Sequence, residues 1–155
     1  MFLFNIYLII CVLTSGSSSK PPNIVMMVVD DMGWSDVPWN NPESPAVNMG
    51  HYARQGIILD HHYAHPKCSP SRAALLTGRY AWSMGRQRGA IERYQPTGLS
   101  TKYQMLPEYL KQAGYVSHAV GKWHLGFCHD DFLPTRRGFD TFFGMWQQST
   151  HYRTR

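Results

Sequence analysis

A continuous apolar run near the start of the chain constrains the fold more than any other feature. Residues 23 to 29 read N-I-V-M-M-V-V, and Asp30 and Asp31 follow directly. A short run without polar alternation suits a strand buried on both faces, which is typical of parallel sheets covered by helices. Ligands of such sheets bind beyond the carboxyl ends of the strands. The sequence therefore predicts an α/β fold with two carboxylates at a ligand-binding edge.

The rest of the pattern alternates helices with short apolar stretches. It predicts helices at 46–55, from about Pro70 to Gly78, and at 105–112, with an apolar stretch at 57–59 and a strand at 115–120. This alternation supports the α/β class. The strand ends in residues 121–124, and from residue 125 to Arg155 the pattern is aromatic and typical of loops, so we expect no further element there.

The first 19 residues resemble a secretory signal peptide. They contain no charged side chain, and an apolar run from Phe2 to Leu13 precedes small residues, which predicts cleavage near 16–19. The run is short for a membrane span, so we expect no span after cleavage. The alternative is a buried N-terminal strand or helix. Cleavage would remove Cys11 and leave Cys68 and Cys128, either disulfide-bonded or with separate fates.

Length, charge and composition limit the possible classes of binding partner only in part. The 155 residues suit one modest domain, and the formal net charge of +5 suits acidic partners. No clustered Lys/Arg run, zinc-finger spacing or RNA-binding aromatic signature occurs, so we predict no nucleic-acid partner.

The most informative short motif is C-S-P-S-R-A at residues 68–73. Ser69 can cap a helix and Pro70 suits the first helical position, which would put Cys68 at the helix N-terminus. Arg72, one turn on, offers five donors suited to an oxyanion. Cys68 is then a thiolate nucleophile, the substrate of a modifying enzyme, or an inert buried cysteine.

Two further pairs are candidates for chemistry. Adjacent carboxylates at Asp30 and Asp31 repel each other unless a cation is near, so they could hold Ca²⁺ or Mg²⁺; the alternative is a solvated turn. Lys122 and His124 alternate at a strand end, so both would point to one side and could hold an oxyanion and move a proton. The alternative is a pair kept for solubility.

Other conspicuous side chains are interpreted more plainly. The histidine spacing matches no standard zinc pattern, so we expect surface or packing roles for His61, His62 and His65. We expect packing roles for Trp34, Trp39, Trp82 and Trp146.

Together these motifs resemble the sulfatase family. C-S-P-S-R at 68–72 fits the family's C-x-P-x-R, with L-L-T-G behind it, and residues 114–124 look like the second sulfatase signature. N-I-V-M-M-V-V-D-D-M-G looks like the family's opening strand and metal-binding aspartates. Residues 134–144 are most similar to the arylsulfatase B, I and J branch. The resemblance implies an alkaline-phosphatase-like fold with a mostly parallel central sheet, present as an incomplete N-terminal portion at 20–155.

The resemblance also implies roles for individual residues. Cys68 would be oxidised by the formylglycine-generating enzyme, and its aldehyde hydrate would attack the sulfur of an aryl or glycosaminoglycan sulfate ester. Asp30, Asp31 and the modified Cys68 would bind Ca²⁺. Arg72 would hold the hydrate, Lys122 would contact sulfate, and His124 would assist the second hydroxyl. A lysosomal or extracellular location would follow.

The chain also departs from the family pattern. A later Asp-Asn pair and a further His and Lys have no counterpart, and Lys67 replaces an apolar residue before the cysteine. Close relatives have cysteines where this chain has Tyr94, Gly98 and Phe132, and two of these positions look like disulfide partners that are lost together. We therefore expect little activity from the 155 residues alone. The alternatives are a short secreted anion-binding protein without turnover, or a phosphate or phosphonate ester hydrolase of the same superfamily.

Overall fold

The computed structural model describes residues 20–148, and the chain divides into two compact units, residues 1–32 and 33–155. The signal-peptide prediction lies outside the described residues. The second unit contains α1 (Val47–Ala53), α2 (Cys68–Thr77), α3 (Leu106–Gln112), β1 (His118–Lys122) and β2 (Thr141–Met145). Single 3-10 turns lie at Trp34–Asp36, Ala81–Met84, Asp130–Phe132 and Pro134–Arg136.

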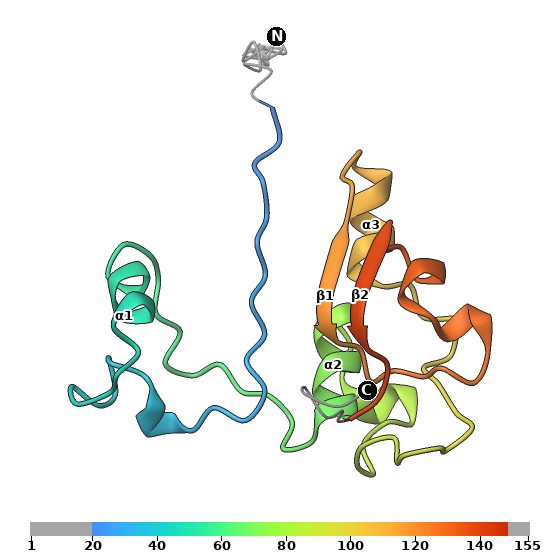
Figure 1. Ribbon diagram of the computed structural model, residues 1–155, viewed down its shortest axis with the longest axis horizontal. Helices are drawn as coiled ribbons and strands as arrows, with labels where there is room; N and C mark the ends of the chain where they lie inside the picture. The colour runs from blue at the N-terminus through green and yellow to red at the C-terminus, as the bar shows by residue number, and fades with distance from the viewer. Residues whose placement is uncertain (1–19, 149–155) are drawn as a thin grey trace, which may run out of the picture. The chain divides into compact units, whose positions relative to one another are not determined.

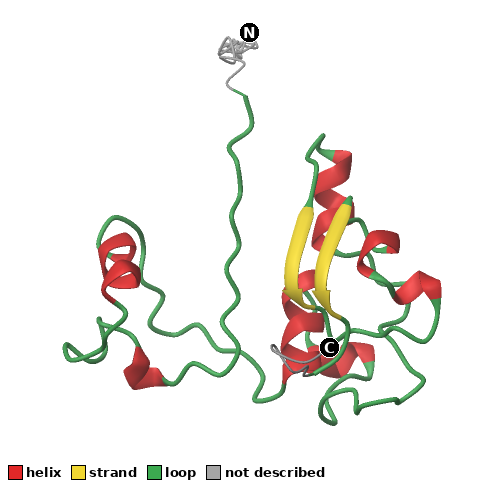
Figure 2. Cartoon of the chain, viewed as in Figure 1, coloured by secondary structure: helices red, strands yellow, loops and turns green. Residues whose placement is uncertain are grey.

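The strand predicted at 23–29 is wrong for this structure. Residues 20–29 are extended but belong to no strand (Figure 2). Their side chains are exposed, Val25 by 89%. A strand needs a neighbour for its backbone N–H and C=O groups, and apolar side chains alone do not supply one. Residues 57–59 likewise form no strand and are exposed.

Helix α2 starts two residues earlier than its motif predicts. Lys67 is the extended N-cap residue and Cys68 is the first helical residue, so Ser69 does not cap the helix and Pro70 is its third residue. Both Ser69 and Pro70 are fully buried instead. The C-terminal prediction is confirmed: Gly78 ends the helix with a left-handed φ of 64°, which glycine adopts without a Cβ clash.

The two strands form a parallel pair, in register from His118 opposite Thr141 to Lys122 opposite Met145 (Figure 1). Strand β2 lies in the region where we expected no element, so that prediction is wrong. Its sequence, T-F-F-G-M, lacks clean alternation, which is why its period did not reveal it. The parallel pairing agrees with the predicted sheet type, and residues 123–140 make the connection.

A small core lies behind the strand pair. It consists of side chains at most 8% exposed, contributed by α2, by the 3-10 turn at Ala81–Met84, by the loop before α3 and by the segment after β1: Ala73, Met84, Leu99, Met105, Trp123 and Leu125. The packing roles predicted for four other tryptophans are wrong, because Trp34, Trp39, Trp82 and Trp146 are each at least 40% exposed. The core thus fixes the first turns of α2 against residues 123–125.

Candidate functional site

Helix α2 and strand β1 bring Cys68 and Lys122 together. The first residue of the helix and the last of the strand are 54 positions apart, yet Lys122 Nζ donates a hydrogen bond to Cys68 Sγ over 3.1 Å. Both side chains are partly buried. An ammonium beside the sulfur favours negative charge at that atom or at any group that replaces it.

Arg72 fixes the same strand end from the helix side. Its Nη1 donates to the backbone carbonyl of Lys122, and the side chain is half-buried. The guanidinium has five N–H donors in a planar fork, a geometry that suits oxygen acceptors. The two predicted cations and Cys68 therefore occupy one place in the fold.

His124 lies just beyond β1 and is 1% exposed. Strand alternation does not extend to it, because β1 ends at Lys122 and His124 has a left-handed φ of 61°. Its Nε2 lies 2.7 Å from the carbonyl oxygen of Ile91. The prediction that strand alternation points Lys122 and His124 to the same side is therefore wrong. His124 nevertheless lies in the segment that packs beside α2.

Two arginines, one buried and one half-buried, hold the loop that supports this segment. Arg137, 2% exposed, donates to the carbonyls of Leu99 (3.1 Å) and Tyr103 (2.7 Å), and Arg86 donates to the carbonyl of Gly98. Desolvation lowers the pKa of both guanidiniums from their ordinary value, but an arginine stays protonated in proteins. The loop in turn binds the segment that follows β1, since Leu99 N donates to Leu125 O over 2.8 Å.

The acidic pair belongs to the first unit. Asp30 and Asp31 end the extended segment, and Asp31 has a left-handed φ of 68°. Within residues 20–148, no group of three or more His, Cys, Asp or Glu side chains surrounds a common point for a metal ion. Carboxylate oxygens are the ligand type that Ca²⁺ prefers, but two residues supply fewer than the six to eight oxygens it takes.

The remaining candidates lie elsewhere. His61 and His62 are exposed and His65 is half-buried, in agreement with surface or packing roles. Among the described residues Cys68 and Cys128 form no disulfide, and Cys128 is exposed. Sequence reasoning missed the role of Ser69, whose Oγ accepts a hydrogen bond from Ile91 N over 2.9 Å inside the site. A serine in the motif was visible, but its contact with residue 91 was not.

Comparison with known proteins decides the family. The family model described as Sulfatase matches residues 22–155. The chain belongs to the sulfatase family. It is 40% identical to mouse arylsulfatase J over 141 residues, which is 91% of this chain and 23% of that protein. It is 42% identical to human N-acetylgalactosamine-6-sulfatase over 139 residues, which is 84% of this chain and 26% of that protein.

A solved structure has a similar fold. The crystal structure of Ps i-CgsB matches with a TM-score of 0.79 and 35% identity, over 84% of this chain and 29% of that one. The predicted alkaline-phosphatase-like fold, present as an N-terminal portion, is thereby confirmed. The chain spans about a quarter of the length of the curated sulfatases it matches.

Proposed function

We propose that the whole protein is a sulfuric ester hydrolase of the arylsulfatase type, acting on aryl or glycosaminoglycan sulfate esters. Cys68 is the catalytic residue after conversion to formylglycine. The observation that carries the proposal is the 3.1 Å contact between Lys122 Nζ and Cys68 Sγ, with Arg72 bonded to the same strand end. A sulfate ester needs cations beside the attacking atom, and this arrangement supplies them.

Each side chain has a role that its chemistry supports. When present, the formylglycine hydrate supplies a hydroxyl nucleophile in place of the thiol. The Lys122 ammonium pairs with the sulfate oxygens, and the planar fork of the Arg72 guanidinium holds the hydrate and the anion. His124 accepts or returns a proton, which an imidazole does near neutral pH.

Asp30 and Asp31 are the proposed protein ligands of Ca²⁺, together with the modified Cys68. Their hard oxygen atoms fit that ion, although the set is incomplete within residues 20–148. The bound ion would supply charge stabilisation to the sulfate oxygens.

The proposed route to this site runs through the secretory pathway, where the formylglycine-generating enzyme would act on Cys68, and leads to the lysosome or the extracellular space. The apolar leader with predicted cleavage near 16–19 supports it. In residues 20–148, no helix is both long and apolar enough to cross a membrane.

Mass spectrometry of peptides from the chain, expressed through a secretory pathway, tests the proposal. We expect the peptide containing Cys68 to show the mass loss from thiol to aldehyde. Cys128 is an internal control: its thiol is exposed, but the sequence around it lacks C-x-P-x-R, so it should stay unmodified. An unmodified Cys68 contradicts the formylglycine assignment and favours an anion-binding protein without turnover.

We expect the 155 residues alone to hydrolyse little or no chromogenic aryl sulfate. The reason is that Asp30 and Asp31 leave a proposed calcium shell underfilled, so charge on the sulfate oxygens is poorly compensated. A colorimetric assay with added Ca²⁺, with Cys68→Ala as the blank, measures this. Sustained turnover above that blank would contradict the expectation.

A further inference from the structure

A buried hydrogen-bonded chain connects the first turn of α2 to His124. Ser69 is fully buried, and its Oγ accepts a hydrogen bond from the backbone N–H of Ile91 over 2.9 Å. The carbonyl of the same residue lies 2.7 Å from His124 Nε2. Ile91 is itself only 5% exposed, so both bonds lie in the interior, where they are shielded from competing water.

This arrangement decides where the imidazole carries its proton. A carbonyl oxygen can only accept, so Nε2 must be the donor. In the neutral ring the other nitrogen, Nδ1, then holds the lone pair and is the basic atom. The opposite tautomer would place two lone pairs against each other in a buried site.

The backbone around His124 is held in an unusual conformation. A left-handed φ of 61° is uncommon for a residue other than glycine, and such conformations persist only where the surroundings over-determine them. Here His124 N donates to Trp146 O over 3.0 Å, and Leu99 N holds the following residue through Leu125 O. The fold thus turns this side chain inward, onto the Ile91 peptide.

We propose that Ser69 is a positioning residue for His124: through the Ile91 peptide it holds the neutral imidazole in the Nε2-protonated form, with Nδ1 as the basic nitrogen. Ser69 touches no reacting atom. It lies next to Cys68 in the chain, so one helical turn provides both the residue to be modified and the support for its proton carrier. The catalytic meaning of this inference rests on the proposed function; the tautomer itself does not.

The test uses long-range proton–nitrogen NMR on the ¹⁵N-labelled 155-residue chain made without the modifying enzyme, so that Cys68 stays a thiol. The His124 signals are assigned by their loss in His124→Gln. We expect a single Nε2-protonated ring in the native chain. In Ser69→Ala we expect a mixture of tautomers, with hydrogen-exchange protection of the Ile91 amide reduced roughly 3-fold to 10-fold, the effect of one lost hydrogen bond.

Two variants separate positioning from general stability. Ser69→Thr keeps the hydroxyl and should restore the single tautomer. Ser71→Ala is the matched control, since it removes a hydroxyl from the same helix whose bond goes to His65 O, over 2.7 Å, and should leave the His124 ring unchanged.

Three results would overturn the proposal. One is a native ring protonated on Nδ1, which needs no variant. Another is a Ser69→Ala ring that keeps its single tautomer while the Ile91 amide loses protection. The third applies if the Ser69→Ala chain does not fold. In that case a folded Ser69→Thr chain that has a protected Ile91 amide but mixed tautomers would overturn the proposal. A failure of Cys68 modification in the mass-spectrometric test affects none of these readings, so the two proposals fail separately.

Discussion

Residues 23–29 and strand β1 make an instructive pair, because the more apolar of the two is not a strand. The first segment reads N-I-V-M-M-V-V and is exposed without a strand partner, whereas β1 reads H-A-V-G-K and pairs with β2 over five residues. Val120 of β1 is 83% exposed, so burial does not explain the difference. A neighbour for the backbone does, since each strand N–H and C=O needs a partner.

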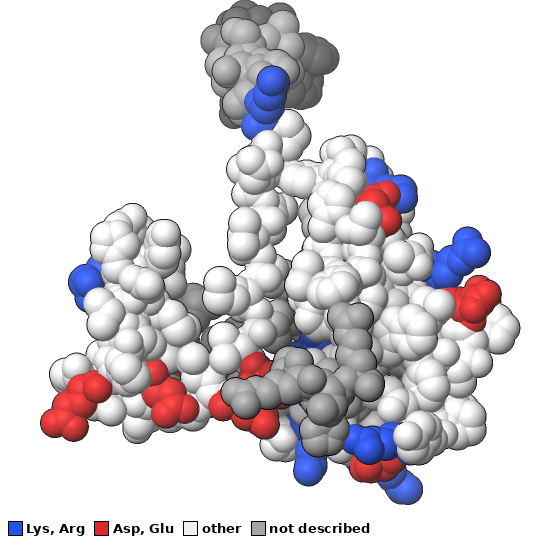
Figure 3. Space-filling view, viewed as in Figure 1, with Lys and Arg blue, Asp and Glu red and all other residues white. Residues whose placement is uncertain are grey.

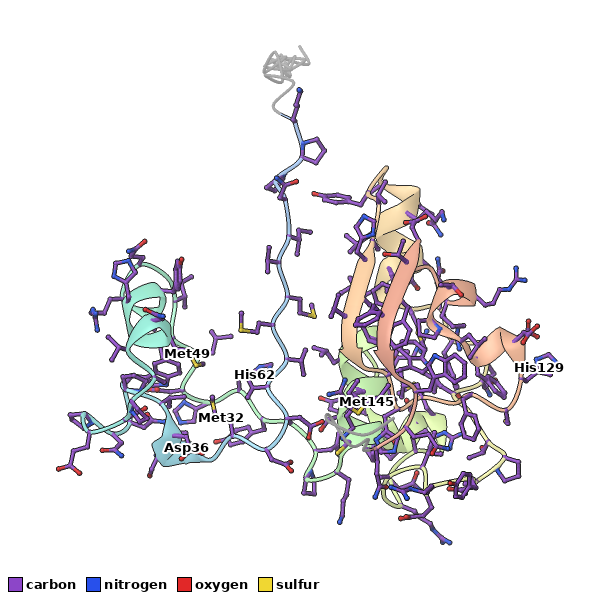
Figure 4. The ribbon with its side chains drawn as sticks, viewed as in Figure 1. Met32, Asp36, Met49, His62, His129 and Met145 are labelled. Atoms are coloured by element: carbon purple, nitrogen blue, oxygen red, sulfur yellow. The ribbon has the colours of Figure 1, made fainter. Side chains whose placement is uncertain are left out.

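The difference extends to the side chains. In the first unit, residues 20–32 expose their apolar side chains; in the second unit, β1 leads directly into Trp123 and Leu125 of the core. Figure 3 shows both Lys or Arg and Asp or Glu on the visible face of the second unit. Met145, labelled in Figure 4, is the last residue of β2.

The largest expected difference between the two segments is in the response to truncation of one side chain to alanine. Leu99 is fully buried in the core, so Leu99→Ala should cost about 2–5 kcal/mol of unfolding free energy through lost burial and a cavity. Val25→Ala, at a side chain 89% exposed, should stay within about 0.5 kcal/mol. Urea unfolding followed by fluorescence measures both. Equal losses would show that residues 23–29 pack in solution.

The sequence predicts the local helices well. Their turns are decided by neighbours in the chain: Gly78 and Gly114 have left-handed φ values of 64° and 84°, as their helix-ending positions predict. Helix α3 begins where Met105 N donates to Glu108 Oε2 over 2.6 Å, a bond between residues three apart. These helix-start and helix-end signals involve only residues that are close in the sequence, so the sequence alone reveals them.

Long-range features could be predicted only from motif identity. Local patterns singled out the four catalytic candidates and the family pattern gave them one shared role, but the bond between Lys122 and Cys68 spans 54 positions, and no period encodes it. The Ser69 contact with Ile91 and the inward turn of His124 depend on the loop held by Arg137, which only the folded chain reveals. Sequence reasoning missed strand β2 for the same reason, because β2 can be recognised only by its pairing with β1.

A second test introduces a covalent link into the packed region. The Phe132 ring occupies a niche left by two glycines: a Cβ placed on Gly98 would lie 2.4 Å from Phe132 Cγ, and one on Gly126 would lie 3.0 Å from Phe132 Cβ. Gly98 and Phe132 are two of the three positions where we expected cysteines in close relatives, and their contact suits the suggestion that two of those positions are disulfide partners.

The double variant Gly98→Cys/Phe132→Cys should therefore form a disulfide in oxidising conditions. Closing a loop of this kind stabilises by about 2–4 kcal/mol relative to the reduced form. Thermal unfolding with and without a reductant measures the gain, and Gly98→Ala, whose methyl meets the Phe132 ring, is the destabilised control. A double variant whose two thiols both remain titratable after oxidation would argue against the contact.

The smallest expected effect concerns the carboxylate of Asp140, which precedes β2 and is hydrogen-bonded to the residue that precedes β1. Asp140 accepts a hydrogen bond from Ser117 N over 2.9 Å and one from Lys111 Nζ over 2.9 Å, and these contacts lower its pKa below the ordinary 3.8. The folded state therefore favours the charged form. Its stabilisation is present above about pH 4 and is lost as the pH falls through the lower pKa of the folded state.

Asp140→Asn should consequently lower stability at neutral pH, and the gap to the native chain should narrow below about pH 4. Lys111→Met removes the exposed ion pair but keeps the Ser117 bond, so its effect should be smaller, because water screens such pairs. Unfolding in urea at a series of pH values measures both variants. A gap for Asp140→Asn that is constant down to pH 2 would show that this carboxylate does not hold β2 beside β1, and the contrast with residues 23–29 would then rest on the β1–β2 ladder alone.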